Sequence, residues 1–202
     1  MGARIVVLVS GAGSNMHALV EACRAGEVPG EVVAVVADRA CTGIDVAGDE
    51  GIETAVLDPR GYATREEWSA ALRDLVEAFA PDLVVSAGFM RILAPVFVGA
   101  FSGRLINLHP SLLPAYPGAH AVRAALEDGV RVTGTTIHFV DDHVDHGPPI
   151  LQREVPVEPG DDEATLHDRI KAAEHALLPE ACRLVLSGRV VLEGDGVRRT
   201  EG

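Results

Sequence analysis

The sequence predicts an α/β protein built on a doubly wound, mostly parallel sheet. In the first half of the chain, short continuous apolar runs alternate with segments of helical periodicity. Continuous runs are typical of strands that helices cover on both faces of a parallel sheet. In the second half, two extended runs follow one another without a helix between them, which predicts an antiparallel hairpin at the sheet edge.

The first half follows a strand–helix order. We expect buried strands at 4–9, 31–37, 52–57, 83–85 and 104–108. Helices are expected at 14–24, near 45–50 and from Thr64 onward. Thr64 and Glu67 form a capping-box pattern, and an apolar stripe at helical spacing follows them. This order predicts a Rossmann-like N-terminal half.

The second half is expected to end in a long helix and a short strand. The extended runs at 132–140 and 149–157 form the predicted antiparallel C-terminal edge. Asp161 is expected to begin the helix, and Pro179 should kink or end it. A last strand is expected at 188–192.

Length and composition favour one acidic domain. A single core can grow to roughly 250–300 residues before it splits, so 202 residues predict one domain over 1–194 and a frayed tail over 195–202. The net charge of -13 repels phosphate backbones, which argues against a nucleic-acid partner. No apolar run reaches the ~18–20 residues of a membrane span. The three cysteines are far apart, which fits a reducing cytoplasm.

The first candidate site is the turn SGAGSN at 10–15, between the first strand and the first helix. Glycines allow close backbone approach, and the free N–H groups of a helix start can hold a phosphate. A tight turn without a ligand is the alternative. Asp38 ends the second strand, where dinucleotide-binding folds place a ribose-binding carboxylate, but Met16 stands in place of their third glycine. Asp38 is otherwise a solvated turn residue.

The second candidate site is the segment NLHPS. Asn107 and His109 are two residues apart at the end of a strand, so their side chains point to the same side of the sheet. A carboxamide donor beside an imidazole suits a carbonyl group that becomes an oxyanion. The alternative is a capping asparagine beside a packed histidine.

The third candidate site is the segment 138–148, which has three histidines and three aspartates within nine residues. The segment could bind a metal, it could supply a carboxylate that orients a catalytic imidazole elsewhere, or it could be an acidic surface loop.

The fourth candidate site is Glu174, which shares a helix face with Ile170 and Leu177. A carboxylate on an apolar face needs a partner. The partner could be a ligand amine or hydroxyl, or the side chain could lie at the wet edge of the stripe. Lys171, one turn away, could be an ordinary exposed charge.

Six motifs together resemble the glycinamide ribonucleotide formyltransferase family. They are SGAGSN, AGFMRIL, INLHPSLLPAYPG, GTTIHFV, the Asp145 loop that ends in GPPILQ, and AAEHALLP. The resemblance implies transfer of a formyl group from 10-formyltetrahydrofolate, as cosubstrate, to the amino group of glycinamide ribonucleotide in de novo purine synthesis. It implies neither a metal nor a covalent enzyme intermediate.

The resemblance also implies residue roles. The catalytic trio is Asn107, His109 and Asp145. The ribonucleotide-binding residues are Gly13, Ser14, Asn15, Met16, His17, Lys171, Ala172, Ala173 and Glu174. The folate-binding residues are Arg65, Met90, Arg91, Ile92, Leu93, Asn107, Asp141, Asp142, His143, Val144 and Asp145. A nucleotide-binding half of about 1–100 then precedes a folate-binding and catalytic half of about 101–194, in a monomer or a homodimer.

The chain departs from the family pattern at three positions. Ala12 replaces a residue that is often polar, Ala115 stands where some relatives have lysine, and His146 follows Asp145 where a small residue is usual. His146 could therefore compete as the partner of Asp145.

Three other functions remain open from the sequence. Formyltetrahydrofolate hydrolases usually add an N-terminal regulatory domain, and methionyl-tRNA formyltransferases usually add a C-terminal tRNA-binding domain; neither is expected here. A non-enzymatic nucleotide-binding module is the third alternative.

Overall fold

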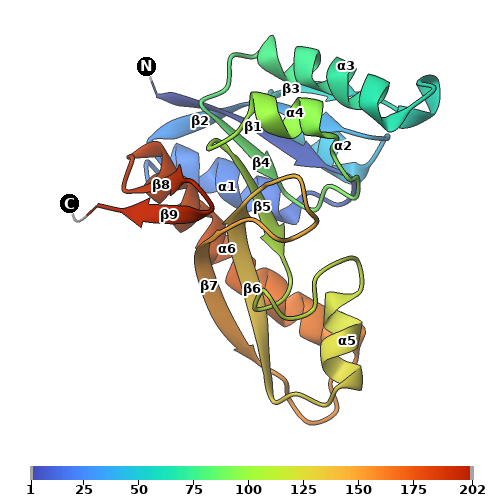
Figure 1. The fold of residues 1–202 in the computed structure, drawn as a ribbon, viewed down its shortest axis with the longest axis vertical. Coiled ribbons are helices and arrows are strands. Elements are labelled where there is room, and N and C mark those ends of the chain that lie inside the picture. Colours follow the sequence, from blue (N-terminus) through green and yellow to red (C-terminus); the bar gives the residue numbers. More distant parts are fainter. Residues whose placement is uncertain (1, 201–202) are drawn as a thin grey trace.

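The computed structural model describes residues 2–200, which form three layers with a sheet between helices (Figure 1). The parallel strands of the main sheet are β1 (Ala3–Val9), β2 (Gly30–Ala37), β3 (Glu53–Val56), β4 (Leu83–Ser86) and β5 (Leu105–His109). The antiparallel edge is the hairpin of β6 (Val132–Phe139) and β7 (Pro149–Pro156). Within the described residues the strand order is β3-β2-β1-β4-β5-β6-β7. The predicted fold class is confirmed.

Helices cover both faces of this sheet. They are α1 (Ser14–Arg24), α2 (Thr42–Asp49), α3 (Arg65–Glu77), α4 (Pro95–Ala100), α5 (Ala121–Glu127) and α6 (Glu163–Leu186). One face carries α1, α2 and α6, with Met16, Leu19 and Leu177 in its core. The other face carries α3 and α4, with Trp68 and Phe97 in its core. From Ile5 to Val9, strand β1 is buried between these layers, and this stretch is accordingly continuously apolar.

The strand order reverses at β1, and this reversal positions the candidate sites. After β1 the chain builds β2 and β3 on one side, and it then crosses to the other side of β1 to build β4 and β5. Doubly wound sheets bind ligands in the crevice at the carboxyl ends of strands near such a reversal. The turn 10–15, the segment 87–93 and the residues after His109 leave the sheet at this edge.

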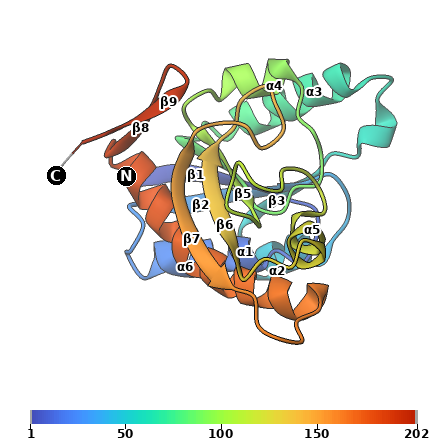
Figure 2. The same cartoon turned by 60° about the horizontal axis from the view of Figure 1, so that its bottom comes forward.

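The hairpin β6–β7 extends away from the parallel part of the sheet, and a separate small core stabilises it. Val155 of β7 packs with Val122 of α5 and with Leu166 and Ile170 of α6. Figure 2 brings this end forward and shows α5 near the start of α6. The short helices α4 and α5 are additions that the sequence patterns did not predict.

The helix start predicted at Thr64 is confirmed, but only one of the two hydrogen bonds of the predicted capping box is present. The Thr64 hydroxyl accepts a hydrogen bond from the Glu67 backbone N–H at 3.1 Å. The Glu67 carboxylate, however, accepts from the Ala63 N–H at 3.2 Å rather than from the N–H of Thr64. One of the four free N–H groups at this helix end, that of Glu67, thus has a side-chain partner, and the Ala63 N–H just before the helix has another.

The sequence predicts that Pro179 kinks or ends the late helix. Pro179 does not end the helix, because α6 continues to Leu186. The helix also begins two residues later than expected, after an Asp162 cap. A proline inside a helix costs about 3 kcal/mol. Leu177, Leu178 and Pro179 itself are buried, the two leucines in the core against the sheet, and burying each leucine contributes about 1.5–3 kcal/mol, which offsets this cost.

The predicted frayed tail over 195–202 is also wrong for most of its length. Strand β9 (Gly196–Arg199) pairs with β8 (Val190–Glu193) in a second, antiparallel sheet. The Arg199 guanidinium donates to the Ile150 carbonyl of β7 and so ties the hairpin to the main sheet. Residues 201–202 lie outside the described part of the chain.

No helix within residues 2–200 combines the length and the apolar character that crossing a membrane requires.

Candidate active site

The turn 10–15 and the segment 87–93 meet at the carboxyl ends of β1 and β4. The Ser10 hydroxyl accepts a hydrogen bond from the Met90 backbone N–H at 2.8 Å. Parallel neighbouring strands end at the same edge of a sheet, so segments 80 residues apart in the sequence come together there. The two predicted binding segments thus form one continuous rim.

Gly13 is required by the shape of the turn. Its φ is 74°, and a Cβ on it would lie 2.8 Å from the Gly43 Cα at the start of α2. The Gly11 carbonyl accepts a hydrogen bond from the Gly43 N–H at 2.9 Å. The turn therefore packs backbone against backbone, which leaves the N–H groups at the start of α1 at the crevice.

Two of the predicted ribonucleotide residues turn away from this crevice. The Met16 side chain is fully buried in the core, so only its backbone could meet a ligand. His17 places Nδ1 2.7 Å from Glu50 Oε1.

Asn107, His109 and Asp145 meet in space. His109 Nδ1 lies 3.2 Å from Asp145 Oδ2, and the Asn107 amide donates to Asp145 Oδ1 at 3.4 Å. The alternation of side chains along β5 puts Asn107 and His109 on the same side, as the sequence predicts. Asp145 reaches them from the loop between β6 and β7, where its own backbone has a φ of 51°. The alternative partner, His146, instead pairs with Asp141.

The environment of Asp145 favours its ionised form. Burial by itself raises the pKa of Asp145. The His138 side chain, the Gly118 N–H and the attraction of His109 lower this pKa by more than burial raises it. The Gly118 N–H donates to Asp145 Oδ2 at 2.8 Å. The pKa of Asp145 therefore lies below its ordinary value, so that at neutral pH a carboxylate faces His109.

His138 and Tyr116 complete the group, and sequence reasoning did not assign them. His138 is the register partner of Asn107 across β5 and β6. Its Nδ1 lies 2.8 Å from the Phe139 carbonyl oxygen, and its Nε2 lies 3.1 Å from the Asn107 amide nitrogen and 3.8 Å from Asp145 Oδ1. The Tyr116 carbonyl lies 2.7 Å from His109 Nε2. Strand pairing could have indicated His138, whereas no sequence pattern marks Tyr116.

Glu174 joins the late helix to the glycine turn. Its side chain is 5% exposed, and it accepts from the Asn15 amide at 2.7 Å and from the Thr135 hydroxyl at 3.3 Å. Asn15 Oδ1 is buried without a hydrogen-bond partner among the described residues. Lys171 lies one turn earlier with its Nζ 3.5 Å from Asp168. The hydrogen-bond partners that a buried Glu174 requires are therefore supplied by the protein, as the Asn15 amide and the Thr135 hydroxyl.

The predicted folate segments present exposed apolar side chains near this edge. Met90 is 69% exposed, Ile92 58% and Val144 52%. Leu93 instead packs against the core under α3 and α4. Arg65 lies at the start of α3, where it pairs with Glu66.

Asp38 is neither a solvated turn residue nor free to bind a ribose. It is 1% exposed, and it accepts from Arg39 at 2.9 Å and from Arg91 at 2.6 Å. Burial raises the pKa of Asp38, but hydrogen bonds from Arg39, Ser10 and Arg91 outweigh it and lower the pKa. Asp38 thus anchors the segment that carries Met90 and Ile92.

The fold and this site define a doubly wound α/β enzyme with an Asn–His–Asp group at the carboxyl ends of its strands. A model of the family described as Formyl transferase matches residues 3–182. The chain belongs to this formyl transferase family.

Named relatives extend over nearly the whole chain. The phosphoribosylglycinamide formyltransferase of Escherichia coli (strain K12) is 46% identical over 187 residues, which are 92% of this chain and 88% of the relative. The trifunctional purine biosynthetic protein adenosine-3 of Homo sapiens is 45% identical over 96% of this chain and 19% of its own length. Among solved structures, glycinamide ribonucleotide transformylase 1 from Symbiobacterium toebii superposes with a TM-score of 0.96, at 46% identity, over 99% of this chain and 95% of that one.

Proposed function

We propose that this chain transfers a formyl group from 10-formyltetrahydrofolate to the amino group of glycinamide ribonucleotide, in de novo purine synthesis. The observation that carries the proposal is the meeting of Asn107, His109 and Asp145 at the end of β5, in a chain of the formyl transferase family. Its relatives named phosphoribosylglycinamide formyltransferase support the choice of acceptor.

The chemistry needs hydrogen-bond donors for a developing oxyanion. The substrate amine attacks the formyl carbon, and the carbonyl oxygen becomes negatively charged in a tetrahedral intermediate. Collapse of this intermediate breaks the bond between the formyl carbon and N10 of the folate, and the departing N10 takes up the proton that the amine has lost, so that tetrahydrofolate leaves. The Asn107 amide, once it gives up its present contact with His138 Nε2, and a protonated His109 donate hydrogen bonds to this oxygen, because preorganised donors stabilise the charge where it develops. Asp145 stabilises the imidazolium and accepts the proton of the amine through water.

His109 must change one hydrogen bond to play this part. Both of its ring nitrogens face oxygens, namely the Tyr116 carbonyl at 2.7 Å and the Asp145 carboxylate at 3.2 Å. The Asp145 contact has to persist because it stabilises the imidazolium charge. We therefore assign the donor for the substrate oxygen to Nε2–H, which exchanges the Tyr116 carbonyl for the substrate.

The ribonucleotide is proposed to bind between the glycine turn and α6. Its phosphate would accept from N–H groups at the start of α1, where the helix dipole also favours negative charge. Asn15 and Glu174 are already hydrogen-bonded to each other, so they can fix the ribose and amine end relative to the phosphate. Ser14, Ala172 and Ala173 lie on the same two elements.

The folate is proposed to bind against the exposed apolar side chains of Met90, Ile92 and Val144. Aromatic ligands bind in mostly apolar sites with a few polar groups that fix orientation. Backbone groups of 90–93 and 141–145 would supply those polar contacts to the pterin ring.

The test is a product assay with three arms. The purified chain is given 10-formyltetrahydrofolate with glycinamide ribonucleotide, with no acceptor, or with methionyl-tRNA. Formyl transfer in the first arm alone supports the proposal. Formate release without acceptor would indicate a hydrolase, formylated methionyl-tRNA would indicate the tRNA enzyme, and no turnover in any arm would leave only a binding module.

A further inference from the structure

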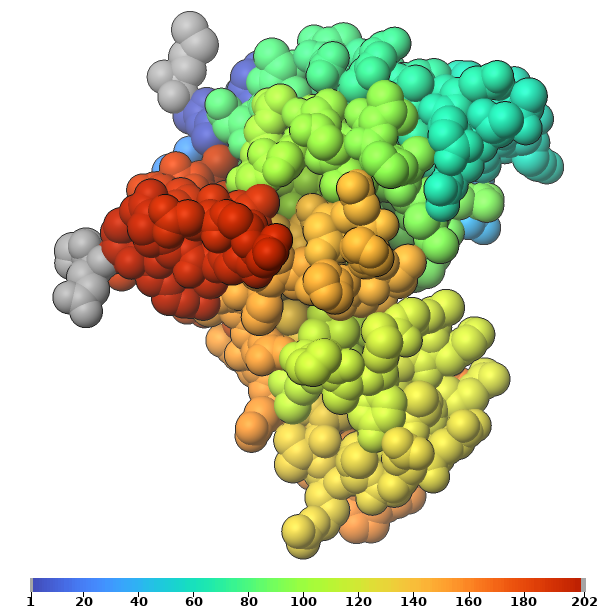
Figure 3. All heavy atoms as spheres, viewed as in Figure 1, coloured from blue at the N-terminus to red at the C-terminus, as the bar shows by residue number. Residues whose placement is uncertain are grey.

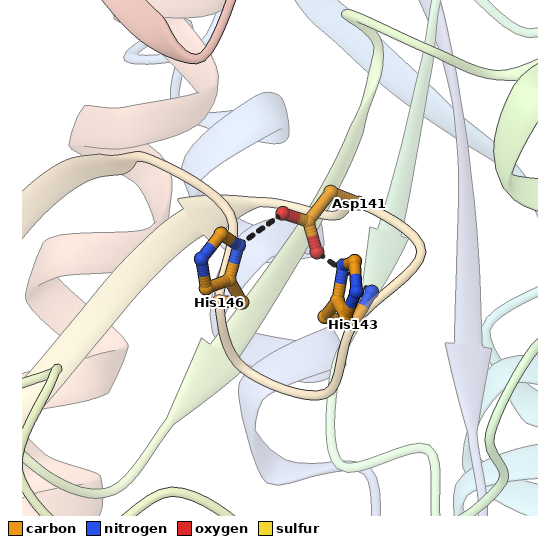
Figure 4. Close-up of side chains that lie close together, drawn as sticks. All are labelled: Asp141, His143 and His146. Carbon is orange, nitrogen blue, oxygen red and sulfur yellow. Dashed lines mark hydrogen bonds and ion pairs between the residues drawn. The ribbon is translucent and has the colours of Figure 1, made fainter.

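A second group of ionisable side chains lies on the same loop as Asp145, in and beside the segment 141–145 whose backbone is proposed to bind the folate. Asp141, His143 and His146 project together from the segment between β6 and β7 (Figure 4). One potential ligand atom from each residue lies within 4.8 Å of the other two. His146 Nδ1 is 2.6 Å from Asp141 Oδ2, and the His143 backbone N–H donates to Asp141 Oδ1 at 2.9 Å.

The backbone of this loop holds the three side chains near one another. The loop is closed at its base, because a Cβ on Gly147 would lie 1.9 Å from the Phe139 carbonyl oxygen. The Asp145 side chain turns inward to the Gly118 N–H, while the neighbouring His146 side chain is 72% exposed. Figure 3 shows this orange segment at the molecular surface, beside the red β8–β9 hairpin.

The surroundings attract a cation. A hollow of about 260 Å³ lies between α4, this loop and the β8–β9 turn, and its described lining includes Asp141, Asp142, His146 and Asp195 but neither lysine nor arginine. Asp195 of the β8–β9 turn lies in the same lining, so it adds a carboxylate near Asp141 and His146. The net charge of the chain is -13, so the wider field also favours positive ions.

The donor set selects the kind of cation. Two imidazoles with one carboxylate suit borderline transition metals, and zinc above all, whereas magnesium and calcium prefer oxygen ligands alone. We propose that Asp141, His143 and His146 form a zinc site on the surface of the chain, with water as the fourth ligand. Their side chains have no part in the chemistry proposed for formyl transfer, so the zinc site can be tested and can fail separately from that function.

The present geometry needs only small adjustments to hold zinc. Bonds of about 2.0–2.2 Å in a tetrahedron place ligand atoms about 3.4 Å apart. The potential ligand atoms now lie 2.6 Å apart in the closest pair and within 4.8 Å of one another overall. Rotation of the side chains therefore has to move these atoms by roughly 1 Å to reach the tetrahedral spacing. Zinc then replaces the proton between His146 and Asp141, as metal binding to histidine generally displaces protons.

The test is titration of the full chain with zinc chloride by isothermal calorimetry, with His143→Gln and His146→Gln as variants. Both side chains are exposed, so neither change threatens folding. The matched control is His17→Gln, because His17 forms a similar exposed pair with Glu50 at 2.7 Å but belongs to no metal-ligand group among residues 2–200. We expect one saturable site, weakened at least roughly tenfold by each variant and unchanged in the control.

Three results would overturn the proposal. They are a zinc Kd weaker than roughly 1 mM for the unmodified chain, zinc binding that both variants retain, and an equal loss in the control. Cobalt(II) provides an independent check, since a four-coordinate site gives intense visible absorption bands. These bands should be absent from the His146→Gln variant.

Discussion

Replacing Asp145 by asparagine removes one negative charge beside His109 and nearly keeps the side-chain shape. Asp145 Oδ2 lies 3.2 Å from His109 Nδ1 and accepts from the Gly118 N–H at 2.8 Å. The asparagine oxygen can keep the second interaction but cannot stabilise an imidazolium as a carboxylate does. We expect kcat to fall, with much smaller changes in the KM values of both substrates.

The separation of the two groups bounds the size of the effect. Opposite unit charges 3.2 Å apart attract by about 5 kcal/mol at an effective dielectric of ~20. Each 1.4 kcal/mol is about tenfold in rate, so a complete loss would reach at most about 10⁴-fold. Because the amide oxygen still accepts hydrogen bonds, we expect a fall of roughly 10²–10⁴-fold, which is the range of general acid–base groups.

The assay is steady-state formation of formylglycinamide ribonucleotide across pH. Asp49→Asn is the matched control, because it makes the same chemical change at an exposed position in α2. A loss of less than about tenfold in Asp145→Asn, or a loss that the control shares, would refute the assigned role. If His109 and Asp145 act as a unit, the double variant His109→Ala with Asp145→Asn loses far less than the product of the single losses.

Three further predictions test the binding residues and the charge of Asp145. Glu174→Ala should raise KM for glycinamide ribonucleotide much more than for the folate, because the carboxylate holds Asn15 at 2.7 Å; equal increases would indicate a structural role. Gly13→Ala and Gly26→Ala should each lose about 1–2 kcal/mol of unfolding free energy from positive φ. Gly13→Ala alone also clashes with the neighbouring backbone, so it should lose more unfolding free energy and weaken ribonucleotide binding. Equal losses of unfolding free energy in the two variants would contradict the close packing assigned to Gly13. Since the pKa of Asp145 is lowered in the folded chain, its ionised form contributes stability above about pH 4, and this contribution disappears as the pH falls through the folded pKa. The difference in unfolding free energy between the parent and Asp145→Asn, measured by urea denaturation, should therefore shrink from about pH 6 to about pH 3, and a widening difference would contradict the sign.

The sequence by itself determined the layers and the main functional segments. Continuous apolar strands and helical stripes are local properties, so they predicted the parallel sheet and its antiparallel edge. The period of two along a strand likewise placed Asn107 and His109 on the same side. The glycines of the segment 10–15 predicted a tight turn between the first strand and the first helix.

Only the tertiary structure decided which distant groups meet. Asp145, rather than His146, faces His109, while His146 pairs with Asp141. Glu174 finds Asn15 across 159 residues of sequence. Such contacts depend on the path of the whole chain, which no local period encodes.

The same reason explains the two corrections and the unassigned neighbours. Pro179 stays inside α6 because packing against the sheet outweighs a local preference, and β9 forms because β8 is there to pair with it. His138 lies opposite Asn107 through the β5–β6 register. The local sequence therefore predicts the candidate groups. Strand order, register and long-range packing decide which partners these groups have, because contacts between remote segments gain free energy only when the fold brings those segments together.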